Sequence, residues 1–274
     1  MKPSALCFSL LVTTLTANAS LILYDGFGGS SGSLEGQGGG TGWGGATWYN
    51  NIDGLANVNY GTPGLTYSTL DVSGNKAVTG GGDSGIFRYM GADRGSGTES
   101  YWISFVVQAT GGAGSSYAGL SLFSGESTER LFIGQRNNQS VFGMERSGGS
   151  SGNSSSSSSS LSYLVARFDF TPSGESARLW VNPDLSGTPT DGTAAVTLTG
   201  LTDFTFDTVR IQSGSSTTFA FDEFRFGDTF ADVTPVPEPI AMALLVFGIL
   251  AVTIGGLRWA RRSSGSISAA TGAI

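Results

Sequence analysis

Three segments of this chain alternate apolar and polar residues with a period of two, and this alternation limits the fold more than any other feature. The segments are 101–108 (YWISFVVQ), 162–170 (SYLVARFDF) and 175–182 (ESARLWVN). Their predicted core faces are Ile103, Phe105 and Val107; Leu164, Ala166, Phe168 and Phe170; and Ala177, Leu179 and Val181. A period of two is typical of half-buried antiparallel strands. Gly-, Ser-, Thr- and Asn-rich turns separate such segments, so we predict one all-β, two-sheet antiparallel sandwich.

The segment 217–226 (TTFAFDEFRF) contains a break in this alternation. Two phenylalanines before Asp222 and Glu223 share one phase, and two after them share the other. The four are Phe219, Phe221, Phe224 and Phe226. One extra residue near the two carboxylates would return both pairs to the core, which describes a β-bulge. We therefore predict a bulge that re-aims this carboxylate pair.

Both ends of the chain carry apolar segments. Residues 1–19 combine a basic start, a short apolar run and an Ala-Asn-Ala site, which predicts a signal peptide cleaved between Ala19 and Ser20. Residues 240–257 contain no charge and span roughly 27 Å as a helix, which is close to the thickness of the bilayer core. A basic cluster follows and is expected to stay in the cytoplasm; it consists of Arg258, Arg261 and Arg262. We expect a single transmembrane helix, with a buried core helix as the alternative.

The composition excludes several classes of chemistry. The chain has no histidine, and its one cysteine, Cys7, lies in the predicted leader. Ser-His-Asp and Cys-His catalysis, common zinc sites and thiol chemistry are therefore excluded from the mature protein. Between Ser20 and Pro239, 21 Asp and Glu stand against ten Lys and Arg, a net charge of −11. A surface this acidic argues against nucleic acid and anionic lipid as partners.

The C-terminal pattern resembles the PEP-CTERM sorting signal. Val236, Pro237, Glu238 and Pro239 form the motif, and the apolar span and the basic cluster follow it. The resemblance implies an exported protein that an exosortase recognises in the inner membrane and then releases or transfers to the cell surface or extracellular matrix. The sorting signal would occupy 234–274, with the basic tail at 258–274, and the exported domain would occupy 20–233. A permanent single-pass anchor is the alternative.

The strand pattern of the exported part is similar to that of the concanavalin-A-like, laminin-G-type jelly roll. The similarity rests on LILYDGF after the leader, the segment 164–189 in the middle, and FAFDEFRFGDTFADVTP before the motif. It implies two sheets of about six or seven strands each, with the first and last strands adjacent. Asp25 and Asp222 would then lie close together and are the candidate ligands for a structural calcium ion. The alternative is that Asp25 begins a turn and Asp222 sits on the bulge.

Aromatic residues are the candidates for sugar binding. Trp43 and Trp48 lie in a polar segment, and Trp180 is expected to face away from the core side of its strand. If these rings are exposed, they could form stacking platforms for a sugar. The alternative is that they are buried in a satellite core under a long loop. We expect the glycine-rich segment 38–45 to be a flexible loop, and the serine run 154–160 to be a disordered loop tip.

These features favour a non-enzymatic envelope or matrix protein that contacts polysaccharide or surface proteins. A glycosidase is the second hypothesis, because paired carboxylates can cleave glycosides. The nearest carboxylate pairs, at Glu126 and Glu129 and at Asp222 and Glu223, do not match the Glu-x-Asp-x-x-Glu pattern of laminarinase-type enzymes. A purely structural coat protein is the third hypothesis.

Overall fold

The computed structural model describes residues 21–29 and 31–235, which belong to one compact unit that ends at Pro235. The predicted signal peptide, sorting motif, membrane helix and basic tail lie outside these residues. Within the described part of the chain, no helix is both long and apolar enough to cross a membrane. The unit ends two residues beyond the predicted boundary at 233.

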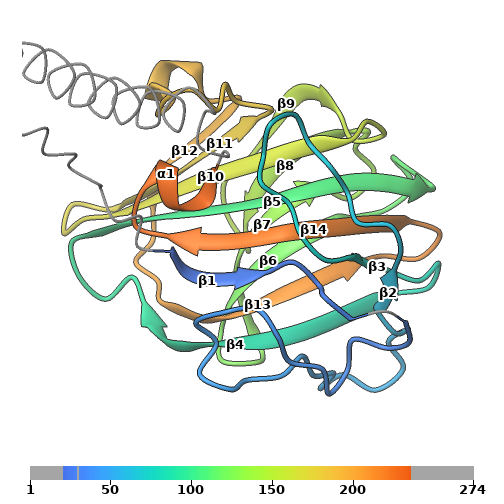
Figure 1. Ribbon diagram of the computed structural model, residues 1–274. Coiled ribbons are helices and arrows are strands. Elements are labelled where there is room, and N and C mark those ends of the chain that lie inside the picture. The colour runs from blue at the N-terminus through green and yellow to red at the C-terminus, as the bar shows by residue number, and fades with distance from the viewer. Residues whose placement is uncertain (1–20, 30, 236–274) are drawn as a thin grey trace, which may run out of the picture. The chain divides into compact units, whose positions relative to one another are not determined.

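Two antiparallel sheets form a sandwich, which confirms the predicted all-β fold (Figure 1). The eight-stranded sheet has the order β12-β11-β10-β5-β14-β3-β2, and β1 pairs with β14. Its strands are β1 (Leu21–Asp25), β2 (Asn59–Gly61), β3 (Lys76–Val78), β5 (Glu99–Gly111), β10 (Ser162–Phe170), β11 (Glu175–Val181), β12 (Val196–Leu201) and β14 (Thr218–Gly227). This sheet therefore has eight strands, where six or seven were expected.

The second sheet has six strands in the order β4-β13-β6-β7-β8-β9. They are β4 (Ser84–Arg94), β6 (Ala118–Ser124), β7 (Thr128–Gln135), β8 (Val141–Arg146), β9 (Ser151–Ser157) and β13 (Phe206–Ser213). The described residues also form two short helices, η1 (Asp191–Thr193) and α1 (Phe230–Val233).

The main core lies between the sheets, and the alternation in β5, β10 and β11 places side chains there as predicted. Ile103, Leu164 and Leu179 are fully buried members of this core. The predicted bulge in β14 is also present: Asp222 and Arg225 pair with Val106 and Ser104 of β5, so β14 has one residue more than its partner. The four phenylalanines of β14 consequently all lie in the core.

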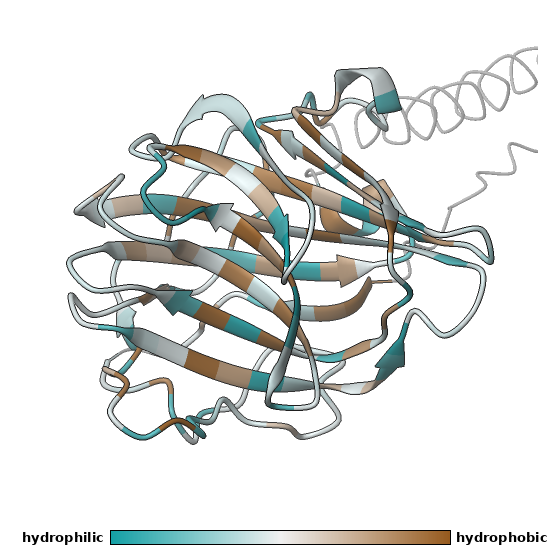
Figure 2. Cartoon of the chain, turned by 180° about the vertical axis from the view of Figure 1, so that it is seen from behind, coloured by the Kyte–Doolittle hydropathy of each residue, from teal (hydrophilic) through white to brown (hydrophobic). Residues whose placement is uncertain are grey.

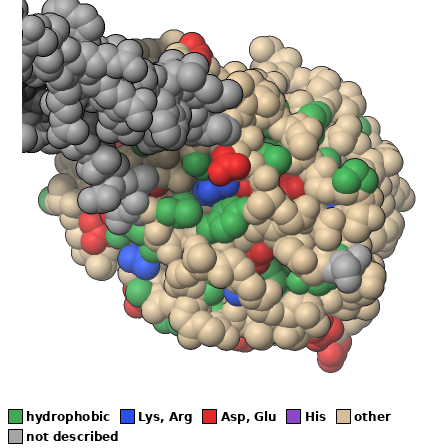
Figure 3. Space-filling model, in the orientation of Figure 1, with side chains coloured by type: hydrophobic (Ala, Val, Ile, Leu, Met, Phe, Trp, Pro, Cys, Tyr) green, Lys and Arg blue, Asp and Glu red, His purple; other side chains and the backbone are tan. Residues whose placement is uncertain are grey.

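The outer face of the eight-stranded sheet is covered by a second apolar cluster. The loop between β2 and β3 crosses this face (Figure 1), and its Leu65 and Leu70 pack in the cluster. Phe230 and Val233 of α1 pack there as well. Tyr163 Oη donates a hydrogen bond to Val233 O, which fixes the end of the chain to this sheet. In the space-filling view of this face, hydrophobic side chains and several acidic and basic ones lie among the other atoms (Figure 3).

Two segments expected to be flexible are ordered. Ser154–Ser157 belong to β9, which pairs with β8, so the serine run is in part an edge strand and not a loop tip. In the glycine-rich segment, Thr41 forms a bridge with Tyr24. Gly42 adopts φ +85°, and a Cβ there would stand 1.8 Å from Ile22 O. The glycines allow this segment to lie against β1, which turns the adjacent Trp43 into the core.

Candidate functional site

The outer face of the six-stranded sheet carries polar and aromatic side chains. In β13, Arg210 and Gln212 alternate with the core residues Val209 and Ile211. Viewed from behind, hydrophilic and hydrophobic residues alternate along the strands (Figure 2). Neither of the two apolar clusters formed by the described residues lies on this face, so it differs from the covered outer face of the other sheet.

A hollow of about 360 Å³ opens on this face. Its lining comes from β7, β8, β13 and the adjoining loops and consists of Tyr117, Glu129, Phe132, Arg136, Asn137, Glu145, Ser147, Gly148, Arg210 and Gln212. The rings of Tyr117 and Phe132 meet edge to face, with centroids 6.4 Å apart. The hollow thus combines two aromatic rings with amide, carboxylate and guanidinium groups, which is the composition of a binding site for a polar ligand.

Hydrogen bonds within the sheet hold the carboxylates of the hollow in place. Glu129 Oε1 accepts from Ser121 Oγ at 2.5 Å and from Gln212 Nε2 at 3.1 Å. Glu145 forms an ion pair with Arg136, whose Nε lies 2.8 Å from Oε2. Arg136 also donates to Asn153 Oδ1 of β9 at 3.0 Å. These contacts preorganise the polar groups, so a ligand would bind without first ordering them.

A second hollow of about 370 Å³ lies on the same sheet, and it is lined by Tyr49, Tyr89, Gly125, Glu126, Asp207 and Thr208. Tyr89 is 42% exposed and is one of the few large apolar side chains that the described surface presents to solvent. Tyr49 stacks on Phe87 at 6.0 Å, and Phe87 meets Phe123 edge to face at 5.3 Å. This row of rings extends from the second hollow toward Arg210 and the first.

The carboxylate of Asp25, a proposed calcium ligand, accepts hydrogen bonds from protein donors. Arg88 Nη1 lies 2.5 Å from Asp25 Oδ2, and both side chains are buried. Trp48 Nε1 donates to the same carboxylate at 2.9 Å, and Phe27 N donates at 2.8 Å. Burial raises the pKa of Asp25. Asp25 therefore belongs to a buried ion pair inside the sandwich.

Asp222 does not share a site with Asp25. The first and last strands are adjacent as predicted, with Asp25 opposite Phe224. The carboxylates nevertheless point to different sides, because Asp25 meets Arg88 in the core while Asp222 accepts from Leu65 N at 2.7 Å under the β2–β3 loop. Burial raises the pKa of Asp222 to about 8. Residues 21–29 and 31–235 contain no group of three Asp or Glu that could hold a metal ion.

Neither tryptophan of the glycine-rich region forms an exposed platform. Trp43 is 3% exposed and Trp48 is 1% exposed, and both pack in the main core. The prediction of a ligand surface at these positions is wrong, because the guanidinium of Arg88 lies 4.2 Å over the Trp43 ring and 5.6 Å from the Trp48 ring inside the sandwich. The satellite-core alternative is also incorrect for this pair.

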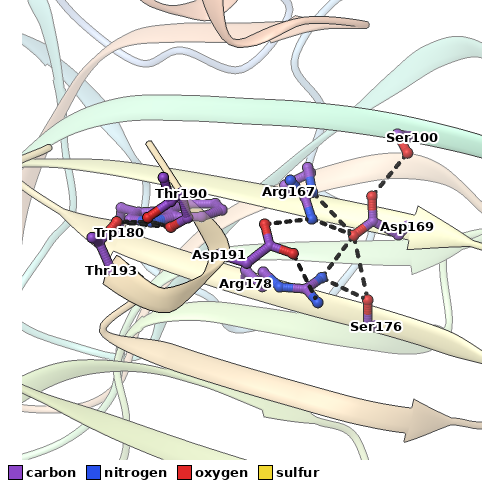
Figure 4. A network of polar contacts seen from close by, with 9 residues as sticks. All are labelled: Ser100, Arg167, Asp169, Ser176, Arg178, Trp180, Thr190, Asp191 and Thr193. Atoms are coloured by element: carbon purple, nitrogen blue, oxygen red, sulfur yellow. Dashed lines mark hydrogen bonds and ion pairs between the residues drawn. The ribbon is translucent and has the colours of Figure 1, made fainter. Parts of the chain in front are cut away.

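Trp180 faces away from the main core as predicted, yet it is only 2% exposed. Its ring stacks on Trp102 with centroids 5.4 Å apart. Its Nε1 donates to Thr190 O and Thr193 Oγ1 of the loop above it (Figure 4). The satellite-core alternative therefore describes Trp180 correctly, and the ring is not available to a sugar.

Two of the four ion pairs in this network hold the loop on the sheet (Figure 4). Arg167 and Arg178, on adjacent strands, each bind Asp169 of the sheet and Asp191 of η1. The distances between the paired atoms range from 2.7 to 3.3 Å. This network holds η1 over the sheet beside Trp180, and a hollow of about 540 Å³ opens there between Trp180 and the loop residues 181–195.

No protein-family model matches this chain, and no curated protein matches it.

Several solved structures resemble its fold. The globular domain of T. cruzi calreticulin is 11% identical over 89% of this chain and 100% of that chain, with a TM-score of 0.47. Domain 4 of AbnA, a GH43 extracellular arabinanase from Geobacillus stearothermophilus in complex with arabinotriose, is 14% identical over 79% and 97%, with a TM-score of 0.45. The Emp46p carbohydrate recognition domain is 13% identical over 58% and 85%, with a TM-score of 0.37. At such identities, these matches carry no information about this chain's ligand.

Proposed function

We propose that this protein binds polysaccharide on the outer face of its six-stranded sheet and does not act as an enzyme. The observation that supports this proposal is the contrast between the two outer faces. Loops, α1 and an apolar cluster cover the face of the eight-stranded sheet, whereas the six-stranded sheet keeps polar side chains around an open hollow. Half-buried polar groups on an uncovered face need partners, and a ligand can provide them.

The chemistry of the hollow fits a sugar. Each hydroxyl of a sugar both donates and accepts hydrogen bonds. The hollow offers carboxylates as acceptors, guanidinium groups as donors, and side-chain amides that both donate and accept. The rings of Tyr117 and Phe132 can contact the apolar faces of a pyranose. Six strands about 4.8 Å apart give a face roughly 24 Å wide, which is enough for several linked sugars.

A glycan array with full-length protein in mild detergent tests this proposal. We expect binding to at least one polysaccharide, and Glu129→Gln should weaken it about tenfold, because the variant replaces a charged acceptor with a neutral amide. Asp184→Asn, on an exposed loop of the other sheet, is the matched control and should bind like wild type. Absence of binding to any glycan would refute the proposal, and release of reducing sugar from the same panel would favour the glycosidase.

We further propose that the chain is exported, held in the inner membrane by residues 240–257, and then sorted by an exosortase to the cell surface or matrix. The support is the sequence pattern of Val236–Pro239, the apolar span and the basic cluster. Prolines keep a segment extended, as a protease requires of its substrate.

The sorting proposal is tested in a host with an active exosortase and a tag fused after Ile274. The tag should disappear from the mature envelope protein, and Glu238→Ala should preserve it. A tag that persists in mature, envelope-located wild-type protein would instead identify a permanent anchor.

A further inference from the structure

Arg210 differs from most arginines of the described chain because it has no carboxylate within ion-pair distance. Five of the nine described arginines form such pairs: Arg88, Arg136, Arg167, Arg178 and Arg225. Arg210 lines the hollow of the six-stranded sheet, and its Nε is buried without a hydrogen-bond partner. The negative charges of Glu129 and Asp83 act on this guanidinium, but neither carboxylate forms an ion pair with it.

The surrounding residues fix the guanidinium of Arg210 against the sheet. Its Cζ lies 5.0 Å from the centroid of the Phe87 ring and 6.0 Å from that of Phe123. Gly85 on the neighbouring strand leaves the space that the group occupies, since a Cβ there would stand 2.6 Å from both Nε and Nη2. Cation–π contact and the absence of a side chain at 85 therefore define one place for the group.

The nearby carboxylates are engaged elsewhere. Glu129 accepts hydrogen bonds from Ser121 and Gln212, and Glu145 is paired with Arg136. Burial lowers the pKa of Arg210, which means that the site disfavours its charge. An anion brought by a ligand would offset this lost hydration, whereas a neutral sugar would not.

We propose that Arg210 binds the carboxylate of an acidic sugar, so the ligand of this face is a polysaccharide that contains uronic acid. This inference rests on the proposed glycan-binding function and names the substrate class for the same hollow. A guanidinium presents donors in a planar fork that matches a carboxylate, and the remaining polar groups of the hollow contact hydroxyls. The exported part of the chain has a net charge of −11, so long-range attraction does not draw a polyanion to it and recognition depends on the local contact.

The test compares polygalacturonate with the same polymer after reduction of its carboxyl groups, using full-length protein in mild detergent. Wild type should bind the acidic polymer at least tenfold more tightly than the reduced one, and galacturonate should compete better than galactose. Arg210→Gln should abolish this preference. Arg210→Lys keeps the charge but loses the fork, so it should keep only part of the preference. Arg178→Gln, which removes an arginine from the covered sheet, should leave it unchanged.

The outcomes separate this inference from the proposed function. Equal binding of both polymers, or a preference that survives Arg210→Gln, would overturn the role of Arg210 while leaving glycan binding intact. Failure to bind every polymer would overturn both proposals. A sulfated polymer such as carrageenan is included, and tighter binding to it than to polygalacturonate would reject the carboxylate in favour of sulfate. If Arg210→Gln does not fold, the galacturonate competition with wild type and the Arg210→Lys variant decide the question.

Discussion

The buried pair of Arg88 and Asp25 offers a quantitative test of how the sandwich is held together. Arg88 donates to Asp25 and also to the carbonyl oxygens of Gly39 at 2.9 Å and Ala46 at 3.0 Å. It therefore ties β4 to β1 and to the glycine-rich segment. In Arg88→Met, Asp25 keeps its donors Trp48 and Phe27 but loses its counter-ion.

Removing one partner of a buried ion pair costs about 3–5 kcal/mol, because the other charge stays buried without compensation. Domains of this kind have total stabilities of about 5–15 kcal/mol, so Arg88→Met should still fold but unfold at a much lower denaturant concentration. Guanidinium denaturation followed by tryptophan fluorescence measures the change, since Trp43 and Trp48 both contact Arg88. A loss below about 1 kcal/mol would show that the pair does not carry this energy.

The loss should also depend on pH. Burial raises the pKa of Asp25 and the charge of Arg88 opposes this rise, so without Arg88 the folded state holds a proton at pH values where the unfolded chain has lost it. Stability of Arg88→Met should therefore fall as pH rises from about 4 toward the folded-state pKa, and the loss should be larger at pH 8 than at pH 5. The double variant Asp25→Asn/Arg88→Met should lack this dependence. An equal loss at both pH values in the single variant would refute the argument.

Because the pKa of Asp222 is raised to about 8, wild-type stability should contain a component that decreases between pH 4 and pH 8, and Asp222→Asn should remove it in urea titrations at several pH values. Excess chelator should leave the melting temperature unchanged, because Asp25 and Asp222 are saturated by protein donors; a drop of several degrees would restore the calcium hypothesis. Gly85→Ala should displace the guanidinium of Arg210 and lower affinity for an acidic glycan severalfold in calorimetry, with little change in the circular dichroism spectrum.

The sequence was sufficient to predict features that depend on local alternation. The core faces of β5, β10 and β11 follow from a period of two, and the bulge in β14 follows from a phase change between two pairs of phenylalanines. The outward direction of Trp180 follows in the same way, but its burial does not, because the covering loop is held by an ion pair between its Asp191 and Arg167 on the neighbouring strand. Serine-rich runs are typical of loops, so only pairing with β8 identifies β9 as a strand.

The sequence does not predict the candidate site, because its residues converge from three strands and the loops beside them. Arg210 and Gln212 are polar positions in an alternating segment, and this alternation was the signal available. It places them on an outer face, but it does not reveal that Glu129 reaches Gln212 across β6. Trp43 was misassigned for a similar reason, since its inward direction depends on how closely Gly42 approaches β1.

The position of β14 in its sheet has a mechanical consequence. The chain leaves the described fold at Pro235, whose carbonyl oxygen accepts from Asp71 N at 2.9 Å, just after α1 and β14. β14 is hydrogen-bonded to β5 on one side and to β1 and β3 on the other, so it lies inside the sheet and not at an edge. A force applied at the C-terminal end along β14 would load these ladders in shear, with many bonds resisting together. An edge strand would instead peel away one bond at a time. If the domain is held at its C-terminal end while the six-stranded sheet binds a polymer, tension would pass through β14. This strand is hydrogen-bonded on both sides.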